Sequence, residues 1–461
     1  MAEKIIPAEL GTESTGKLLK KYAIPAIIAM TASSLYNMID SIFIGHGVGA
    51  LAIAGLAVTF PLMNLSAAFG TLVGVGASTM LSVLLGQKNY VAANKVLGNI
   101  ASLNAIIGLV FMTVSLIFLD PILYFFGASE NTIPYAREYM QIILAGNAVT
   151  HMYLGLNNAL RSSGNPKLAM NLTIMTVILN VILAPIFIFS FKWGIRGAAA
   201  ATVIGQVIAL VIVLRYFSNT DRILHFQKGI FRLDFRIAKE SLAIGLAPFL
   251  MNSAACIVTL FINQQLKKYG GDMAIGAYGI VNRISFIFIM IVIGLNQGMQ
   301  PIAGYNYGAR NYSKVKEVFW KTVKYATIVT CFGFLLAEIF PKAAVSVFTH
   351  DSEMVDLGTK GLRLLVLAYP FVGFQMVASN FFQCLGMVNK AILLSMSRQL
   401  LFLIPCVYIL PLFFEAKGVW MSFPIADFVA FIISAVLFAG IARKINKLKD
   451  GDDPSVLGSR L

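Results

Sequence analysis

Asp40 is a carboxylate placed inside an otherwise uncharged apolar run, Tyr22–His46. Ionisable side chains at membrane depth are costly to insert, so one that persists is a functional-site hypothesis by default. The run exceeds the roughly 20 apolar residues that a helix needs to span a bilayer. Removal from water favours the protonated form of a carboxyl group, and a carboxylate can also bind a cation. Asp40 is therefore a candidate site for coupling to a proton or a metal ion.

Polar neighbours of Asp40 are expected on the same helix face. Tyr36 lies four residues earlier and Asn37 three residues earlier, which places both beside Asp40 in an α-helix. The alternative interpretation is a structural carboxylate that is capped by these hydroxyl and amide donors. Polar residues in other apolar segments can likewise form the site or only bond helices together; they are Tyr139, Asn157, Asn180 and Thr202.

The second half of the chain also carries charges at or near membrane depth. Asp427 stands well inside an apolar segment and needs a partner, whereas Glu338 lies near a segment end and can reach water. Arg283 can pair with a carboxylate or extend its charge to the interface. These residues are candidates for a polar network, with a structural role as the alternative.

Composition indicates a membrane protein. Of the 461 residues, 58% are hydrophobic and 12% are charged, with a mean hydropathy of +0.79; soluble domains carry about 25% charged residues. The net charge of +15 comes from Lys and Arg concentrated in alternate connections. This bias predicts that both termini lie in the cytoplasm, and it explains the basic charge without a nucleic-acid partner.

Twelve apolar stretches are long enough to cross a bilayer as helices, the only spanning form open to such segments. We expect them at residues 18–46, 52–84, 94–119, 138–160, 168–190, 194–217, 240–266, 274–305, 318–340, 360–384, 391–413 and 418–442. The glycines of the second stretch, Gly70, Gly74 and Gly76, predict close helix packing rather than a nucleotide-binding loop, because no strand precedes them.

The chain repeats itself. GQKNYVAANKV begins at Gly86 and GARNYSKVKEV begins at Gly308, and the same shift carries Gly164 onto Gly386. Six crossings in each half give parallel repeats, so we predict an all-α integral membrane protein with two six-helix bundles related by a pseudo-two-fold axis along the membrane normal. The predicted divisions are an N-terminal lobe (1–218), a basic cytoplasmic linker (219–239), a C-terminal lobe (240–445) and a disordered tail (446–461).

Several motifs resemble the MATE (multidrug and toxic compound extrusion) family, especially its bacterial DinF/MepA-type branch. They are YNMIDSIFIG at Tyr36–Gly45, RSSGNPK at Arg161–Lys167, NRISFIFIMIVIGLNQGMQPIAGYNYGA at Asn282–Ala309 and PIADF at Pro424–Phe428. The resemblance implies a monomeric exporter of organic cations or amphipathic toxins in the bacterial cytoplasmic membrane. No cofactor or enzyme activity is implied.

The resemblance also implies which residues couple transport to an ion. The family's first-helix Asp matches Asp40, its segment-five Asn matches Asn180 and its segment-six Thr matches Thr202, which together form a proton site or a possible Na⁺ site. One departure is Ala184, which precedes Pro185 where the family commonly has an Asp. The missing carboxylate should weaken a Na⁺ site, and it should ease ionisation of Asp40 because paired carboxylates oppose each other's charge.

Two other functions fit a chain of this kind. A lipid-linked oligosaccharide flippase of a related fold should line its cavity with cations for pyrophosphate, whereas only Arg283 stands out as an embedded cation. A membrane-embedded transferase should carry a cluster of acidic or His residues at the cytoplasmic side. The only adjacent acidic pair is Asp452-Asp453, near the C-terminus. A multidrug antiporter driven by H⁺ or Na⁺ is the interpretation that the sequence favours.

Overall fold

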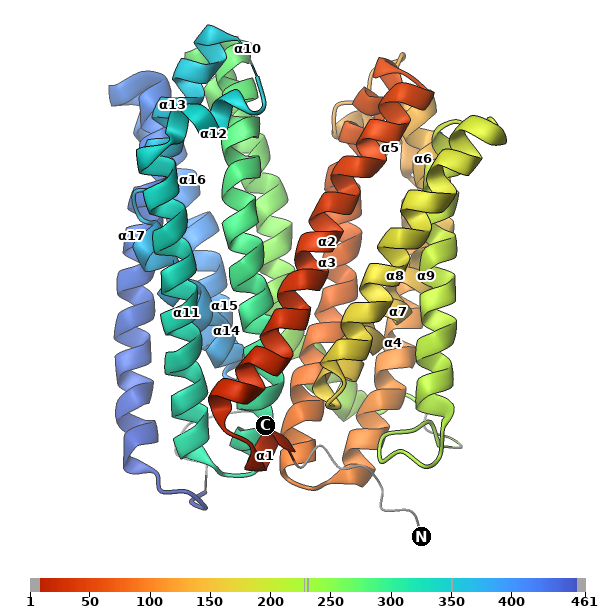
Figure 1. Ribbon diagram of the computed structural model, residues 1–461, viewed down its shortest axis with the longest axis vertical. Coiled ribbons are helices and arrows are strands. Elements are labelled where there is room, and N and C mark those ends of the chain that lie inside the picture. The colour runs from red at the N-terminus through yellow and green to blue at the C-terminus, as the bar shows by residue number, and fades with distance from the viewer. Residues whose placement is uncertain (1–8, 228, 230–231, 350, 454–461) are drawn as a thin grey trace. The chain divides into compact units, whose positions relative to one another are not determined.

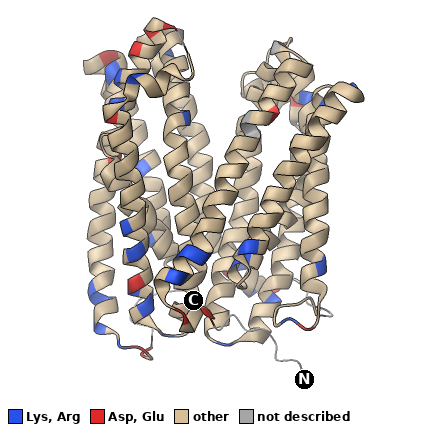
Figure 2. Cartoon of the chain, in the orientation of Figure 1, with Lys and Arg blue, Asp and Glu red and all other residues tan. Residues whose placement is uncertain are grey.

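A computed structural model describes residues 9–227, 229, 232–349 and 351–453, apart from the side chains of Asn37, Met38, Ala50 and Asp272. Within these residues the chain is helical, with no β-strand. Figure 1 shows long helices throughout, and Figure 2 shows that many of the charged residues lie toward the ends of these helices. This distribution suits helices whose central parts lie in hydrocarbon, and it confirms the predicted all-α membrane fold.

The structure divides into two compact units. The described parts of the first are residues 9–13 and 28–249, and those of the second are residues 14–27 and 250–453. The first unit contains α1 (Glu9–Thr12), most of α2 (Thr15–Gly47), α3 (Ala50–Gly86), α4 (Tyr90–Ile117), α5 (Leu119–Phe125), α6 (Ile133–Ala145), α7 (Asn147–Ser162), α8 (Pro166–Pro185), the π-helix η1 (Ile186–Ser190), α9 (Ile195–Ser218) and the start of α10 (Phe235–Gly308).

The second unit holds the remainder of α10, which breaks at Gly271, and the beginning of α2. Its other helices are α11 (Tyr312–Ile339), α12 (Pro341–Ser346), α13 (Ser352–Val366), α14 (Tyr369–Cys384), α15 (Val388–Met396), the π-helix η2 (Ser397–Leu403), α16 (Ile404–Ile409) and α17 (Pro411–Lys447).

The start of α2 packs within the second unit because two glycines on α10 leave room for its backbone. A Cβ atom on Gly298 would lie 2.5 Å from Ala23 Cα, and one on Gly294 would lie 2.7 Å from Ile27 Cα. Side chains at these positions would hold the helices apart. A division by sequence segments alone, with residues 1–218 as one lobe, does not anticipate this exchange.

Ten helices among the described residues are long and apolar enough to span a membrane, and the bent pair α13–α14 would make eleven. The twelfth predicted stretch, 138–160, corresponds to α6 and α7, which meet at Gly146. With 13 and 16 residues, neither α6 nor α7 is long enough to count as a span by itself, and α7 also buries Asn147, His151 and Arg161 inside the unit.

The predicted repeat is present in the backbone. Lys88 and Arg310 both adopt φ 58°, a left-handed conformation that is uncommon for residues other than glycine. The next residues, Asn89 and Asn311, cap α4 and α11 by accepting hydrogen bonds from the backbone N–H three residues later. Each helix has 28 residues. Two halves that share an unusual turn, a cap and a helix length support an origin by duplication.

The predicted linker and tail both contact neighbouring helices. Asn94 on α4 donates to the Ile223 carbonyl (3.0 Å) and accepts from the His225 N–H (2.9 Å). At the other end of the chain, Asp450 accepts a hydrogen bond from the Ser313 N–H (2.9 Å) at the start of α11. Residues 449–453 therefore make specific contacts, although the segment from residue 446 was predicted as disordered.

Candidate functional site

Asp40 is buried on α2, with 4% of its surface exposed. Its carboxylate oxygen Oδ1 is buried and has no hydrogen-bond partner among the described residues. A buried carboxylate without donors is unfavourable unless it holds a proton or a cation. The structure thus confirms that Asp40 is buried, and its role in coupling stays a prediction.

A hydroxyl–amide network lies on the helices that surround Asp40. Asn180 on α8 donates its side-chain N–H to Thr202 Oγ1 on α9 (2.9 Å), and Thr202 donates to the Ala198 carbonyl (3.1 Å). The Tyr36 hydroxyl is 2.7 Å from Thr202 Oγ1. Because Thr202 has one hydroxyl hydrogen and directs it to Ala198, Tyr36 is the donor in this contact. Both lone pairs of the Thr202 oxygen are therefore occupied.

The network contains one further oxygen that accepts no hydrogen bond from the described residues. Asn180 Oδ1 is buried and has no hydrogen-bond partner among the described residues. Tyr139 on α6 is fully buried and close enough to interact electrostatically with Tyr36 and Asp40. The structure thus brings Tyr36, Tyr139, Asn180 and Thr202 to the surroundings of Asp40. Asn37 was also predicted there, but its side chain lies outside the described part of the structure.

Ala184 lies one turn beyond Asn180 on α8, and it is fully buried. It belongs to an apolar cluster that includes Ile44, Tyr139 and Ile188. The predicted common face of positions 180 and 184 is confirmed, since both side chains point into the first unit. At position 184, however, that face is apolar.

Asn157 belongs to a different cluster. Its side-chain N–H donates to Thr173 Oγ1 (3.3 Å), and the Tyr153 hydroxyl lies 3.4 Å from the same atom. These contacts join α7 to α8 about two helical turns before Asn180. The sequence identified Asn157 as a buried polar residue, but the helix packing does not bring it to Asp40.

In the second unit, Asp427 on α17 pairs with Arg398 on η2. Asp427 is 3% exposed, so its charge is compensated inside the unit. Arg283 is exposed on α10, and Glu338 pairs with Arg363 near the end of α11. Sequence reasoning predicted that Asp427 needs a partner but did not identify Arg398. An arginine at the centre of the apolar stretch 391–413 was the available signal.

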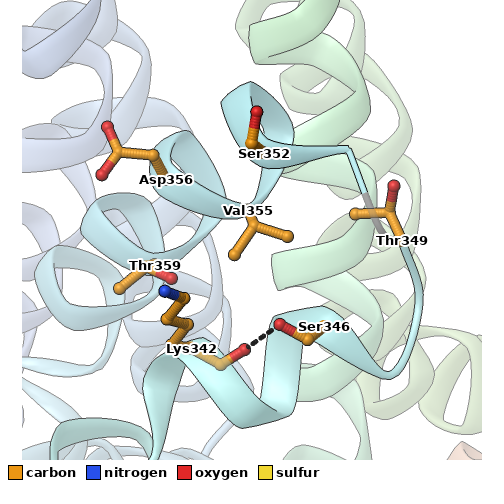
Figure 3. A pocket seen from close by; sticks show the side chains of 7 residues that line it. All are labelled: Lys342, Ser346, Thr349, Ser352, Val355, Asp356 and Thr359. Carbon is orange, nitrogen blue, oxygen red and sulfur yellow. Dashed lines mark hydrogen bonds between the residues drawn. The ribbon is translucent and has the colours of Figure 1, made fainter.

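One pocket of the second unit has a polar lining and a volume of about 330 Å³. Figure 3 shows the side chains that line it, on and between α12 and α13. Its lining consists of Lys342, Ser346, Thr349, Ser352, Val355, Asp356 and Thr359. It contains none of the residues predicted from the sequence. Across the described residues there is also no group of three or more His, Cys, Asp or Glu side chains suited to a metal ion.

The chemistry of the site in the first unit is that of a cation or proton acceptor. Its open groups are oxygen atoms, one from a carboxylate and one from an amide. The hydroxyl groups of Tyr36 and Thr202 are engaged with each other and with the Ala198 carbonyl. A cation could contact both of these oxygens, whereas a proton would compensate only the Asp40 oxygen. The hydrogen-bonded network connects this site to α2, α8 and α9.

Comparison with known proteins identifies the family. The chain matches the MatE family over residues 25–186 and 243–409. It is 26% identical over 424 residues to multidrug export protein MepA of Staphylococcus haemolyticus, which covers 92% of this chain and 93% of that protein. MepA of Staphylococcus aureus strain MSSA476 is 27% identical over 416 residues, covering 89% of this chain and 90% of that protein.

Solved structures agree with the sequence comparisons. The MATE multidrug transporter DinF-BH in complex with rhodamine 6G is 38% identical, with a TM-score of 0.89 over 97% of this chain and all of that one (100%). An outward-facing MATE family transporter of the MOP superfamily has the same fold, with a TM-score of 0.90 at 24% identity over 96% of this chain and 100% of that one. The family resemblance seen in the motifs is confirmed, and the chain belongs to the MATE family of multidrug efflux transporters.

Proposed function

We propose that this protein is a secondary active antiporter that exports cationic or amphipathic organic compounds in exchange for protons or sodium ions. The observation that carries the proposal is the buried Asp40 oxygen Oδ1, which accepts no hydrogen bond from the described residues and lies beside the Tyr36–Thr202–Asn180 network. A scaffold has no use for such an open acceptor, because burying it without a partner is destabilising.

A proton is the coupling ion that the local chemistry favours. A metal ion stripped of its water needs several oxygen ligands. Thr202 has both lone pairs engaged and position 184 carries no carboxylate, which leaves Asp40 and Asn180 as the acceptors of this group that hold buried, unpartnered oxygens among the described residues. A proton needs only one acceptor, and Asp40 is sufficient for it.

Protonation can drive alternating access only if the two orientations of the transporter bind the proton with different affinity. The hydrogen bonds from Tyr36 and Asn180 to Thr202 supply such a difference if they rearrange when Asp40 becomes neutral. In this cycle Asp40 takes up a proton from outside, the compound is released outward, and proton release to the cytoplasm resets the transporter.

The test is transport of rhodamine 6G into proteoliposomes under an imposed pH gradient, compared with an imposed Na⁺ gradient. For electroneutral exchange of one proton for one monovalent cation, each pH unit should support about a tenfold concentration ratio. Asp40→Asn should abolish this accumulation, and Asp40→Glu should retain part of it. The control is Asp120→Asn, because Asp120 is a half-exposed carboxylate of the same unit that pairs with Arg137.

Accumulation in Asp40→Asn at the level of the Asp120→Asn control would refute the coupling role of Asp40. Accumulation driven by a Na⁺ gradient at constant pH, and lost in Asp40→Asn, would make sodium the coupling ion. We also propose a monomer in the bacterial cytoplasmic membrane with both termini inside, which the Lys and Arg bias supports. Labelling of single cysteines near each terminus in intact cells tests this orientation.

A further inference from the structure

The second unit contains an ion pair, Arg398–Asp427, that the proposed coupling site does not use. Arg398 lies on the π-helix η2, and Asp427 lies on α17. The pair therefore ties an irregular part of one spanning segment to the neighbouring helix. Wide π-type turns inside helices are frequent at functional sites, because they re-aim the side chains that they carry.

Depth and exposure indicate what Arg398 faces. It is half-way along the 22-residue span Val388–Ile409, so it lies near the middle of the membrane. Its side chain is 26% exposed, whereas that of Asp427 is 3% exposed. A guanidinium group at this depth does not face hydrocarbon, because a charge exposed to lipid is costly. The exposed part of Arg398 therefore faces a volume that admits water or a ligand.

The pair leaves hydrogen-bond donors open on that side. Arg398 donates through Nε to Asp427, and its two Nη groups make no hydrogen bond to any other described residue. Tyr369 is close enough to interact electrostatically with both charges. The buried hydroxyl groups of Tyr369 and Ser285 lie beside each other, and neither makes a hydrogen bond to a third group within the described part of the chain. Asp427 therefore compensates the charge of Arg398 but leaves the two Nη groups of the guanidinium without a hydrogen bond among the described residues.

We propose that Arg398, with Tyr369 beside it, forms a substrate subsite in the second unit that binds the carboxylate of amphipathic compounds carrying an acidic group. The planar guanidinium fork suits a carboxylate, which can accept two parallel hydrogen bonds. The transporter would then accept zwitterionic compounds as well as simple cations, an inference that rests on the proposed export function.

A matched pair of dyes tests the subsite. Rhodamine 6G is an ethyl ester, and its free acid differs by carrying a carboxylate on the same cationic ring system. Binding of both dyes to the purified transporter is measured by fluorescence polarisation, and uptake of both is measured in proteoliposomes. The readout is the ratio of the affinity for the acid to the affinity for the ester. Loss of hydrogen bonds to a charged group should lower this ratio at least about tenfold.

Two variants keep the test independent of folding. Arg398→Met with Asp427→Leu removes both charges at once, because removing Arg398 alone would leave a buried, uncompensated carboxylate. Arg398→Lys retains the positive charge beside Asp427 but lacks the planar fork, so it decides the question if the double variant fails to fold. The control removes the exposed pair Arg363–Glu338 by substituting Gln at both positions.

The proposal predicts a fall in the acid-to-ester ratio in both variants and no change in the control. A ratio within threefold of the parent in either folded variant would overturn it. This outcome is distinct from failure of the proposed function. That failure would be seen as rhodamine 6G uptake in the parent that does not respond to any imposed ion gradient, whatever the acid-to-ester ratio.

Discussion

Restoring a carboxylate at position 184 examines the coupling site most directly. The variant Ala184→Asp introduces a second acidic group one turn from Asn180, on the same buried face of α8. The parent residue is fully buried among apolar side chains that include Ile44 and Ile188. The new carboxylate would therefore enter a dry site that already contains the open Asp40 oxygen.

The expected loss of stability follows from that environment. Adding heavy atoms to a packed apolar site costs about 1–3 kcal/mol, and leaving a buried polar group without a partner costs about 1–3 kcal/mol more. The total of roughly 2–6 kcal/mol is large beside the 5–15 kcal/mol that stabilises a typical folded protein. A cation that binds between the two carboxylates would recover about 2.7 kcal/mol at a concentration 100 times its Kd.

Thermal unfolding in detergent at pH 7.5 measures both effects. The parent and Ala184→Asp are compared in NaCl and in KCl at equal ionic strength, and then in KCl at pH 5. We expect the variant to unfold at a lower temperature than the parent in KCl. It should regain stability in NaCl, because two carboxylates can hold a cation, and at acid pH, because one carboxyl group becomes neutral. The parent should unfold at the same temperature in both salts.

Two results would refute this reasoning. If Ala184→Asp is as stable as the parent in KCl at neutral pH, the side chain at 184 does not enter a dry site near Asp40. If the parent is stabilised by Na⁺ over K⁺, then Asp40 and Asn180 suffice for a sodium site, and proton coupling loses its structural argument. Ala184→Asn is the matched control, because it adds similar volume without a charge.

Two further predictions concern helix packing and the C-terminal segment. A Cβ atom on Gly76 would lie 1.9 Å from the Ser241 carbonyl oxygen, so Gly76→Ala should force α3 and α10 apart and lower the free energy of unfolding by about 1–3 kcal/mol, as measured by thermal unfolding. The control is Gly440→Ala, because a Cβ atom at Gly440 meets no atom within 4 Å. Equal stability of the two variants would contradict the packing. The Ser313 N–H lowers the pKa of Asp450, so its contribution to stability is present above the unfolded-state pKa and is lost as the pH falls through the folded-state value. Asp450→Asn should therefore cost a few tenths to about 1 kcal/mol at pH 7. The difference should begin to shrink as the pH falls through the ordinary Asp pKa of about 3.9 and should vanish only below the lower folded-state pKa; a difference that does not depend on pH would exclude the charge as its cause.

Much of the fold follows from local signals in the sequence. Apolar length and composition predict membrane helices, and the motif repeated from Gly86 to Gly308 predicts the shared turn and asparagine cap. The glycine spacing around Gly76 likewise predicts close packing, which the structure shows. The assignment of residues 14–27 to the second unit is different, because it depends on whether Gly294 and Gly298 meet α2. That contact joins segments that are far apart in the chain.

For the candidate site too, the sequence predicted some features, and the packing of the helices decided the others. The sequence by itself identified Asp40 as a buried carboxylate and placed Tyr36 beside it, since both depend only on hydrophobicity and the 3.6-residue period of a helix. Only the tertiary structure decided that Thr202 is saturated by Tyr36 and Asn180, that Asn157 belongs to another cluster, and that Asp427 is compensated by Arg398. The reason is physical: which residues are polar and buried is a property of each helix, whereas which donor meets which acceptor depends on how separate helices cross.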